Sequence, residues 1–527
     1  MKVYVINTGG TISCTGDPLV PMSAQNFATA CGRLLNPIFE GQFPKLEIIY
    51  VTDLTFHSST GTLDSTNLQP TDWCLMAEYI LNHYADCDGW VILHGTDTMG
   101  FTGTGLPFLL SAFSSEGYST ATLSKPVIIT GSQVPMFERE ADTPDQLTLR
   151  YNTDAYQNFC GAMAAAQSGI PEVCIYFDSY LYRGNRSVKT NASEFKAFSS
   201  PNYPALGEYG IDFNVYFERV LPLPASDDVS LDTLSVRLKV IEQLRSIKEK
   251  INSFPVMQFN AFPAWYVSGN SDNPSSALIA SLINACTPYI KGLILESYGE
   301  GNFPSGDPDD PQNGAVYQAL QDANTSGIVI VDCTQVIQGV VNDSAYGAGA
   351  WLPEVGALNP NDMTPMAALA KLTILLASAE HNSWSPDVVK HLLQLNLLGE
   401  MLNTSRLDSR TNSTLLPGEK LVTLDGSASL TNDPVDGPVL KDIANKTVLW
   451  CALTNPSPDQ MPGRLIMQNN GNLVFYSRDN APIWSTDTGG SDRAFSMLVL
   501  DGSNKSATLT VYDYSNEKNT SILYPSC

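Results

Sequence analysis

Basic residues are scarce in this chain of 527 residues. Lysine and arginine together number 29 against 54 aspartates and glutamates, which gives a formal net charge of −25. A surface that binds nucleic acid needs clustered positive charge, so this balance disfavours a nucleic-acid partner. We take the acidity to serve mainly solubility.

Long apolar runs and paired cysteines are also missing. No stretch is long and apolar enough to span a bilayer, so no membrane partner is expected. The start of the chain has neither the basic stretch nor the apolar core of a signal peptide, which favours the cytoplasm, while leaderless export stays open. The 10 cysteines are scattered without any Cys-x-x-Cys spacing, so neither a disulfide framework nor a metal site is expected.

The chain does contain two apolar runs that each end in glycine and threonine. Residues 3–7 lead into Thr-Gly-Gly-Thr-Ile at 8–12, and residues 90–93 lead into His-Gly-Thr-Asp-Thr-Met at 94–99. Such runs are typical of buried parallel strands, and open α/β sheets hold their ligands at the carboxyl ends of these strands. The two segments therefore predict one site, built from two strand ends, with a threonine nucleophile.

These segments resemble the two signature motifs of the bacterial-type L-asparaginase family. The similarity is colinear to about residue 380 and fits the cytoplasmic, type I branch best. The other matching segments are Leu-Asp-Ser-Thr-Asn-Leu at 63–68, Ile-Thr-Gly-Ser-Gln-Val-Pro at 129–135, Arg-Gly-Asn-Arg-Ser-Val-Lys at 183–189 and Ser-Tyr-Gly-Glu-Gly-Asn at 297–302. The resemblance implies a two-domain α/β fold and a hydrolase without metal or organic cofactor.

The resemblance also implies the catalytic residues. Thr11 would be the nucleophile that forms a covalent acyl-enzyme. Thr96, Asp97 and Lys189 would form a second constellation, in which the lysine takes a proton from the Thr96 hydroxyl. Read alone, Thr11 better suits a hydroxyl that caps the next helix, whereas the other motifs in order favour the nucleophile. Asp97 with Lys189 also suits an ordinary ion pair.

Substrate binding is implied by the same resemblance, for a set made up of Asp64, Ser65, Thr96, Asp97 and Asn302. A carboxylate such as Asp64 suits the α-ammonium of an amino acid, and the Ser65 hydroxyl suits its α-carboxylate. Asn302 and Tyr346 would complete the site of a neighbouring subunit, in a homodimer or homotetramer. Tyr346 equally suits a packed aromatic residue.

One position departs from the family pattern. Many relatives carry a tyrosine on the loop after the first motif, and Leu19 stands where that tyrosine would fall. A water, the Thr96–Lys189 pair or another tyrosine must then take the proton of Thr11. His94 in the second motif is expected to be structural rather than a base.

The order of elements predicts four regions. Residues 1–204 alternate strands and helices, as in a parallel α/β domain, with strands at 3–7, 46–51, 90–93, 126–130 and 173–177 and helices at 72–83 and 156–166. Residues 205–253 read as a linker with an amphipathic helix at 231–251. Residues 254–406 read as a second α/β domain with closing helices, and residues 414–527 read as an all-β domain. The apolar face of the amphipathic helix is expected to contain Leu238, Ile241, Leu244 and Ile247.

The all-β region shows internal similarity. Residues 447–450, 473–476 and 509–512 look like three versions of one strand. Residues 468–476 resemble the mannose-binding motif of bulb-type lectins, which form a β-prism from three repeats, and the candidate sugar-binding residues are Gln468, Asn470, Asn472 and Tyr476. Asn470 replaces the aspartate of that motif and lacks its charge. The degenerate copies leave open whether this region binds a mannose-type carbohydrate or serves packing.

The sequence thus predicts an L-asparaginase that hydrolyses L-asparagine to L-aspartate and ammonia, joined to a lectin-like β-prism. Two alternatives remain. One is a broader amidase that also accepts glutamine. The other is a carbohydrate-binding protein whose hydrolase body is inactive, although the intact set of Thr11, Thr96, Asp97 and Lys189 disfavours it.

Overall fold

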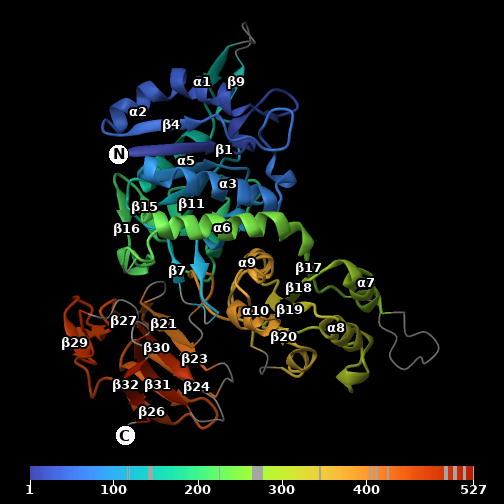
Figure 1. The fold of residues 1–527 in the computed structure, drawn as a ribbon, viewed down its shortest axis with the longest axis vertical. Helices are drawn as coiled ribbons and strands as arrows, with labels where there is room; N and C mark the ends of the chain where they lie inside the picture. The colour runs from blue at the N-terminus through green and yellow to red at the C-terminus, as the bar shows by residue number, and fades with distance from the viewer. Residues whose placement is uncertain are drawn as a thin grey trace.

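A computed structural model gives the arrangement of the whole chain (Figure 1). It describes all residues except 116, 118, 140–145, 225, 264–276, 343–345, 403–404, 410–412, 424–426, 492–495, 502–506, 514–517 and 526–527. The largest sheet and its helices fill the upper half of Figure 1, a second α/β region lies at the lower right, and the strands that end the chain lie at the lower left. No helix of the described residues combines the length and apolar character needed to cross a bilayer.

The first region is built on an eight-stranded sheet with the order β16-β15-β12-β11-β8-β5-β1-β4. Its five parallel strands confirm the predicted ones: β1 (Lys2–Asn7), β4 (Glu47–Val51), β5 (Gly89–Leu93), β8 (Val127–Thr130) and β11 (Val173–Phe177). The antiparallel edge consists of β12 (Tyr180–Arg183), β15 (Gly207–Tyr209) and β16 (Phe213–Val215). The last two strands fall within residues 205–253, so the stretch expected as a linker begins with strands of this sheet.

Both faces of this sheet are buried, which explains its near-continuous apolar strands. Val5 and its neighbours on one face pack with α1 (Ala24–Leu34) and α5 (Ala155–Ala165). Ile6 and its neighbours on the other face pack with α3 (Pro70–Asn82) and α4 (Met99–Leu109). The helices predicted at 72–83 and 156–166 are therefore confirmed as α3 and α5.

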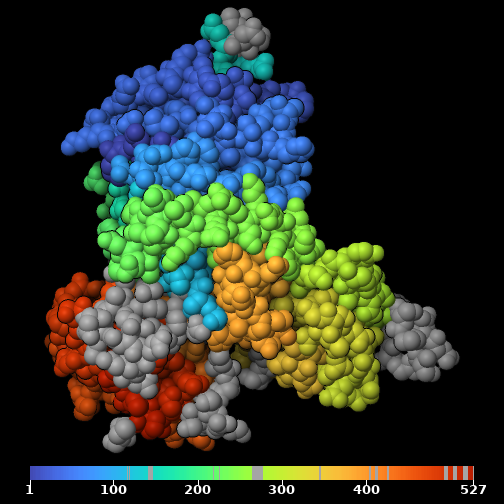
Figure 2. All heavy atoms as spheres, in the orientation of Figure 1, coloured from blue at the N-terminus to red at the C-terminus, as the bar shows by residue number. Residues whose placement is uncertain are grey.

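The predicted amphipathic helix is α6 (Leu234–Lys250), which crosses the front of Figure 1 and packs against α3 and α9 (Pro365–Ser378). Ile241, Leu244 and Ile247 are buried as expected, but Leu238 is 52% exposed. A three-residue repeat drifts around a helix of 3.6 residues per turn, so the buried stripe instead runs through Val236 and Val240. Figure 2 shows this helix packed without a gap against orange atoms, which belong to the part of the chain that contains α9 and α10 (Pro386–Leu393).

The second α/β region contains a four-stranded parallel sheet with the order β17-β18-β19-β20. Its strands are β17 (Val256–Asn260), β18 (Gly292–Ser297), β19 (Val329–Thr334) and β20 (Ala357–Leu358), and its outer helices are α7 (Leu278–Cys286) and α8 (Ala315–Thr325). Helix α9 packs on the sheet from the side of the first region. The two α/β regions thus share one apolar core.

The final region contains strands arranged as three four-stranded antiparallel sheets. Each sheet takes one short strand from residues 406–422, which are β21 (Arg406–Asp408), β22 (Thr414–Leu415) and β23 (Lys420–Val422). Each adds three consecutive strands: β24 (Ala428–Asp433), β25 (Gly437–Asp442) and β26 (Val448–Cys451); β27 (Arg464–Met467), β28 (Leu473–Tyr476) and β29 (Pro482–Ser485); and β30 (Ser496–Asp501), β31 (Thr508–Asp513) and β32 (Lys518–Tyr524). Apolar side chains from all three sheets share one core.

The sheets correct one part of the predicted repeat. Strands β28 and β31 are the second of their three consecutive strands, as the similarity of residues 473–476 and 509–512 indicates. Residues 447–450 fall in β26, which is the third strand, so the equivalent second strand is β25. Alternating apolar residues occur in every half-buried strand, so the pattern alone does not give a strand its place in the sheet. Trp450 on β26 instead matches Trp484 on β29, and their rings lie 5.7 Å apart.

Candidate active site

The first motif turns sharply after β1 because of two glycines. Gly9 and Gly10 have φ angles of 121° and 75°, a region that favours glycine. A Cβ atom on Gly9 would lie 2.0 Å from the carbonyl oxygen of Leu63, and one on Gly10 would lie 2.3 Å from the Cα of Gly95. The backbones of the first motif, the 63–68 segment and the second motif are therefore in direct contact.

Hydrogen bonds hold these three segments together. Thr8 N donates to Leu93 O at 3.0 Å, Leu63 N donates to Thr8 O at 2.7 Å, and Gly10 N donates to Leu63 O at 3.1 Å. The Thr98 hydroxyl then donates to Ser65 O at 2.8 Å. Backbone placement at the strand ends is thus fixed before any substrate arrives.

Thr11 opens the short helix η1 (Thr11–Ser13) that follows the two glycines. Its side chain is half-buried, and no described residue accepts or donates a hydrogen bond at its hydroxyl. The helix has no side-chain cap, so the capping role that Thr11 would also suit is not realised. The hydroxyl is left available for other chemistry.

The side chain of Lys189 contacts two residues of the second motif. Its Nζ donates to Thr96 Oγ1 at 2.8 Å and to Asp97 Oδ1 at 2.7 Å. The Thr96 side chain is buried, whereas 23% of the Lys189 side chain and 54% of the Asp97 side chain are exposed. The predicted trio is therefore brought together, with its ammonium placed to exchange a proton with the Thr96 hydroxyl.

Close backbone packing sets the position of Lys189. The lysine follows the short helix η4 (Gly184–Arg186), which lies against α4. A Cβ atom on Gly103 of α4 would lie 2.8 Å from the carbonyl oxygen of Gly184. Likewise, a Cβ atom on Gly184 would lie 2.5 Å from the carbonyl oxygen of Gly103. Since α4 starts at Met99, the last residue of the second motif, this contact fixes Lys189 relative to Thr96.

Asp64 and Ser65 lie next to this cluster. Ser65 is buried beside Gly95, and its Oγ has no hydrogen-bond partner among the described residues. Asp64 is exposed, and its Oδ1 accepts from both the backbone N and the hydroxyl of Thr66, at 3.0 and 2.9 Å. A buried hydroxyl without a partner is costly unless a ligand supplies one. The pair thus offers a carboxylate and a free hydroxyl beside the second motif.

His94 is fully buried, and both of its ring nitrogens are engaged. Nδ1 lies 2.6 Å from Gly95 O, which can only accept, so Nδ1 carries the proton and Nε2 accepts from the Thr102 hydroxyl at 2.8 Å. Burial lowers the pKa of His94 to about 4. A neutral histidine without a free nitrogen fixes the turn rather than moving protons.

Three further predicted positions lie apart from this cluster. Leu19 is 51% exposed at the tip of the hairpin formed by β2 (Cys14–Thr15) and β3 (Val20–Pro21), so it presents no polar group to Thr11. Asn302 belongs to the second α/β region, where its backbone pairs with Tyr298, and Tyr346 is 58% exposed. No contact among the described residues joins Asn302 or Tyr346 to Lys189 within this chain.

The candidate sugar-binding residues share the hairpin of β27 and β28. Gln468 Nε2 donates to the Tyr476 hydroxyl at 2.7 Å. Asn470 Oδ1 accepts from Asn472 N at 3.1 Å, and Asn472 Oδ1 accepts from Thr488 N at 3.2 Å. Asn470 is exposed and the other three side chains are half-buried, and part of their hydrogen-bonding capacity is used within this hairpin and its neighbour.

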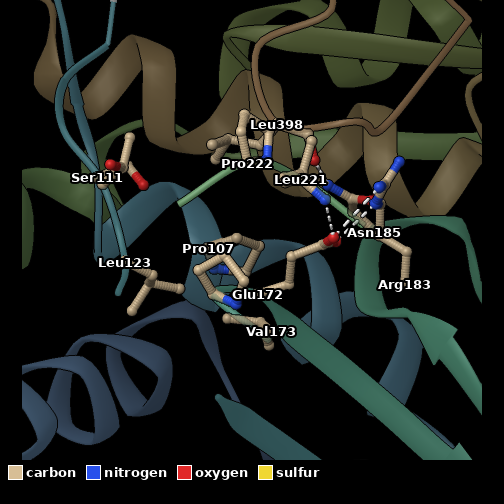
Figure 3. A pocket seen from close by; sticks show the side chains of 12 residues that line it. Pro107, Ser111, Leu123, Glu172, Val173, Arg183, Asn185, Leu221, Pro222 and Leu398 are labelled. Atoms are coloured by element: carbon tan, nitrogen blue, oxygen red, sulfur yellow. Dashed lines mark hydrogen bonds and ion pairs between the residues drawn. The ribbon is translucent and has the colours of Figure 1, made fainter. Parts of the chain in front are cut away.

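Sequence reasoning missed a buried ion pair beneath η4, shown in Figure 3. Arg183 donates to Glu172 at 2.7 and 3.2 Å, with side chains 3% and 2% exposed, beside a cavity of about 20 Å³ that is too small for an amino acid. The Glu172 carboxylate also accepts from Leu221 N. A charged residue directly before the apolar strand at 173–177 was the available signal, because such a residue needs a partner when the strand is buried.

Comparison with known proteins matches this architecture. A family model described as "Asparaginase, N-terminal" matches residues 2–221, and one described as "Glutaminase/Asparaginase C-terminal domain" matches residues 275–386. The chain is 34% identical over 402 residues to L-asparaginase 1 of Escherichia coli K12, covering 76% of this chain and 98% of that protein. The chain belongs to the L-asparaginase family. As a member of this family, it is an amidohydrolase.

Two further similarities fit this asparaginase. The crystal structure of L-asparaginase I from Vibrio cholerae is similar with a TM-score of 0.53 and 29% identity, over 76% of this chain and 98% of that chain. A human 60 kDa lysophospholipase is 32% identical over 69% of this chain and 54% of its own length. The two matching family models stop at residue 386, so they do not extend into the three-sheet region.

Proposed function

We propose that this asparaginase hydrolyses L-asparagine to L-aspartate and ammonia, with Thr11 as nucleophile. The Thr11 oxygen attacks the side-chain amide carbon, the proton of its hydroxyl passes to the amide nitrogen, the carbon–nitrogen bond breaks, and ammonia leaves. Water then attacks the β-aspartyl ester on Thr11, the ester bond breaks, and a proton from the water restores the Thr11 hydroxyl as aspartate is released. One amide and one water are consumed, and no metal or cofactor takes part.

Proton transfer is assigned to Thr96 and Lys189. The lysine ammonium lies 2.8 Å from Thr96 Oγ1, within the reach that general acid–base catalysis requires. Asp97 on the other side of Nζ keeps the amine oriented. This pair takes the role of the tyrosine that the exposed Leu19 does not supply.

Substrate binding is assigned to residues that lie beside the second motif. Asp64 and Asp97 receive the α-ammonium, and the unpartnered Ser65 hydroxyl receives the α-carboxylate. Asn302, which lies away from Lys189 in its own chain, completes the site of a second copy in a homodimer or homotetramer. The single observation that carries the proposal is the Lys189 bridge between Thr96 and Asp97 beside the Gly10–Gly95 contact.

Ammonia release tests this proposal. Wild type is expected to release ammonia from L-asparagine, and Thr11→Ala to lose about 10³-fold or more in rate while it stays folded. Ser13→Ala is the matched control, because the only partner of this buried hydroxyl among the described residues is the Gly10 carbonyl. Equal rates for wild type and Thr11→Ala would refute the assignment.

Glutamine is a second candidate substrate, since the matched C-terminal family carries both names. The glutamine side chain is one methylene longer, and one methylene is worth about 1–3 kcal/mol in discrimination. Comparing kcat/KM for the two amides decides between a narrow asparaginase and a broader amidase.

We propose for the three-sheet region a lectin-like β-prism that binds a mannose-type sugar at Gln468, Asn470, Asn472 and Tyr476. The three four-stranded sheets and the polar side chains at the turn between β27 and β28 support it. Retention on immobilised mannose, lost in Gln468→Ala, is the expected result. Passage of wild type without retention would leave this region a packing module.

A further inference from the structure

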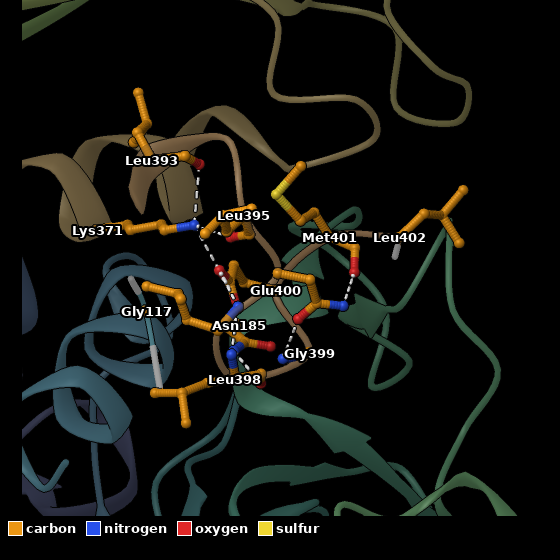
Figure 4. Close-up of polar contacts among 12 residues, drawn as sticks. Gly117, Asn185, Lys371, Leu393, Leu395, Leu398, Gly399, Glu400, Met401 and Leu402 are labelled. Carbon is orange, nitrogen blue, oxygen red and sulfur yellow. Dashed lines mark hydrogen bonds and ion pairs between the residues drawn. The ribbon is translucent and has the colours of Figure 1, made fainter. Parts of the chain in front are cut away.

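Behind the catalytic lysine lies a fully buried ion pair that organises a loop. Lys371 on α9 and Glu400 are both 0% exposed, and Lys371 Nζ donates to Glu400 Oε1 at 2.6 Å (Figure 4). The same ammonium donates to the carbonyl oxygens of Leu393 and Leu395, at 2.9 and 2.5 Å. All three of its protons are therefore used to hold the chain that leaves α10.

Glu400 fixes the loop from the other side. Its carboxylate accepts from Leu397 N at 3.0 Å and from Leu398 N at 2.7 Å. Asn396 closes the turn by accepting from Gly399 N at 2.7 Å. We call residues 395–402 the buried loop; its shape is set by two charged side chains rather than by helix or strand bonds.

The buried loop presents its carbonyl oxygens to η4. Asn185 Nδ2 donates to Leu398 O at 2.9 Å, and Arg186 Nη1 donates to Glu400 O at 3.3 Å. Arg186 also pairs with Asp362 at 2.8 Å, and Asp362 accepts from Leu402 N at 2.7 Å. Figure 4 shows Asn185 reaching Leu398 directly beneath Glu400. The residues of η4 are thus attached to the loop at several points.

Helix η4 is held between two fixed surfaces. On one side it meets α4 through the Gly103–Gly184 contact. On the other side the buried loop holds Asn185 and Arg186. Lys189 follows only three residues after Arg186, so a shift of η4 moves the lysine away from Thr96. A displacement of about 1 Å can cost about 10²-fold in rate.

The three-sheet region continues from this loop. Arg406 at the start of β21 donates to Gly117 O at 2.9 Å, and Gly117 packs against Leu395. Glu419, between β22 and β23, interacts electrostatically with Arg186 and Arg183. In Figure 2 a light-blue segment of the first region reaches down between the red strands and the orange helices. The loop is thereby enclosed by all three regions.

We propose that the buried loop is a positioning element of the hydrolase, and that Lys371, Glu400 and Asn185 are positioning residues for Lys189. The proposal rests on the function proposed above for Lys189. A fully buried ion pair adds little net stability compared with apolar side chains of the same size, because desolvation offsets the attraction. Its effect here is to give the loop one shape and so to give Lys189 one place.

The test uses two variants of the full chain. Asn185→Leu keeps the branching of the side chain, with larger terminal groups, and removes the donor to Leu398 O. Glu400→Gln removes the charge that Lys371 faces. Both are expected to lower kcat by about tenfold or more, with KM near the wild-type value, because substrate groups are untouched. Backbone amides of residues 186–190 are expected to exchange hydrogen faster than in wild type.

Glu78→Gln is the control, since it breaks the Lys248–Glu78 pair between α6 and α3, away from η4. It is expected to leave kcat and the exchange of residues 186–190 unchanged. Wild-type kcat in a folded Asn185→Leu variant would overturn the proposal, even if Glu400→Gln failed to fold. If wild type releases no ammonia, the proposed function fails, and hydrogen exchange of residues 186–190 alone then decides on the positioning role. Faster exchange in the Asn185→Leu variant than in wild type supports that role. Unchanged exchange overturns it.

Discussion

Gly10 lies against Gly95, although 85 residues separate them, so closely that a Cβ atom on Gly10 would stand 2.3 Å from the Cα of Gly95. This contact joins the end of β1 to the end of β5, which are adjacent strands of the sheet. The threonine that follows each glycine is therefore carried to the same edge of the sheet, and the candidate site depends on the absence of a side chain at both positions.

Gly10→Ala should accordingly disrupt the site. Its φ of 75° disfavours alanine, and the added methyl meets backbone atoms that have no room to move. We expect a loss of about 2 kcal/mol or more in the free energy of unfolding and nearly complete loss of ammonia release. Chemical denaturation and the ammonia assay check this.

Gly32→Ala is the matched control. Gly32 lies inside α1, and nothing stands within 4 Å of the position its Cβ would take. Alanine there should stabilise the protein by about 0.5–1 kcal/mol and leave the rate unchanged. Similar losses for the two variants would mean that the Gly10–Gly95 contact has no special role.

Lys189→Met should separate catalysis from binding. Removal of the ammonium leaves Thr96 without its proton partner, so kcat should fall by about 10²–10⁴-fold. Asp97→Asn should lower kcat and also raise KM, because Asp97 is assigned to both the lysine and the substrate ammonium. Steady-state kinetics with L-asparagine distinguish a variant that changes kcat alone from one that changes both constants. An unchanged KM for Asp97→Asn would place the substrate ammonium on Asp64 alone.

His94 should make stability depend on pH. Its pKa is about 4 in the folded protein, against an ordinary value of 6.5, so between these values the unfolded chain binds a proton that the folded chain does not. Stability is then lost as pH falls from about 6.5 to about 4, by up to about 3 kcal/mol. The free energy of unfolding, measured with urea at several pH values in this range, should depend less steeply on pH in His94→Gln than in wild type. An identical pH dependence would contradict the assignment of a neutral histidine.

Glu172→Gln should be strongly destabilising. It leaves the Arg183 guanidinium buried without its counter-charge, which typically costs about 3–5 kcal/mol. Glu47→Gln provides the comparison, because the Lys2–Glu47 pair is 37% and 60% exposed and such pairs contribute about 1 kcal/mol or less. Equal unfolding midpoints for the two variants would contradict the conclusion that the buried Arg183–Glu172 pair beneath η4 depends on both charges.

Much of the fold could be predicted from the sequence because apolar runs and glycines act locally. The five parallel strands of the first sheet follow from continuous apolar segments. The convergence of Thr96, Asp97 and Lys189 was implied by the family resemblance of their motifs. The buried face of α6 was only partly predicted, since Leu238 shares the sequence spacing of the buried residues but lies on the exposed side.

The buried charges could not be placed in advance. Lys371 stands alone among apolar residues of α9, and a lone lysine there fits either an exposed position or a buried partner. Its partner Glu400 lies 29 residues further on, in a loop without helical or strand periodicity. Pairing of this kind depends on how separate elements pack, which spacing along the chain does not encode.

The most direct test is to trap the intermediate. Wild-type protein mixed with L-asparagine and quenched in acid within one turnover should carry a β-aspartyl group on Thr11, identified by mass spectrometry of its peptide, and Thr11→Ala should carry none. Ammonia release from asparagine with the group on another residue, or with the same rate in Thr11→Ala, would contradict the convergence of Thr11 with Thr96, Asp97 and Lys189 in one catalytic site.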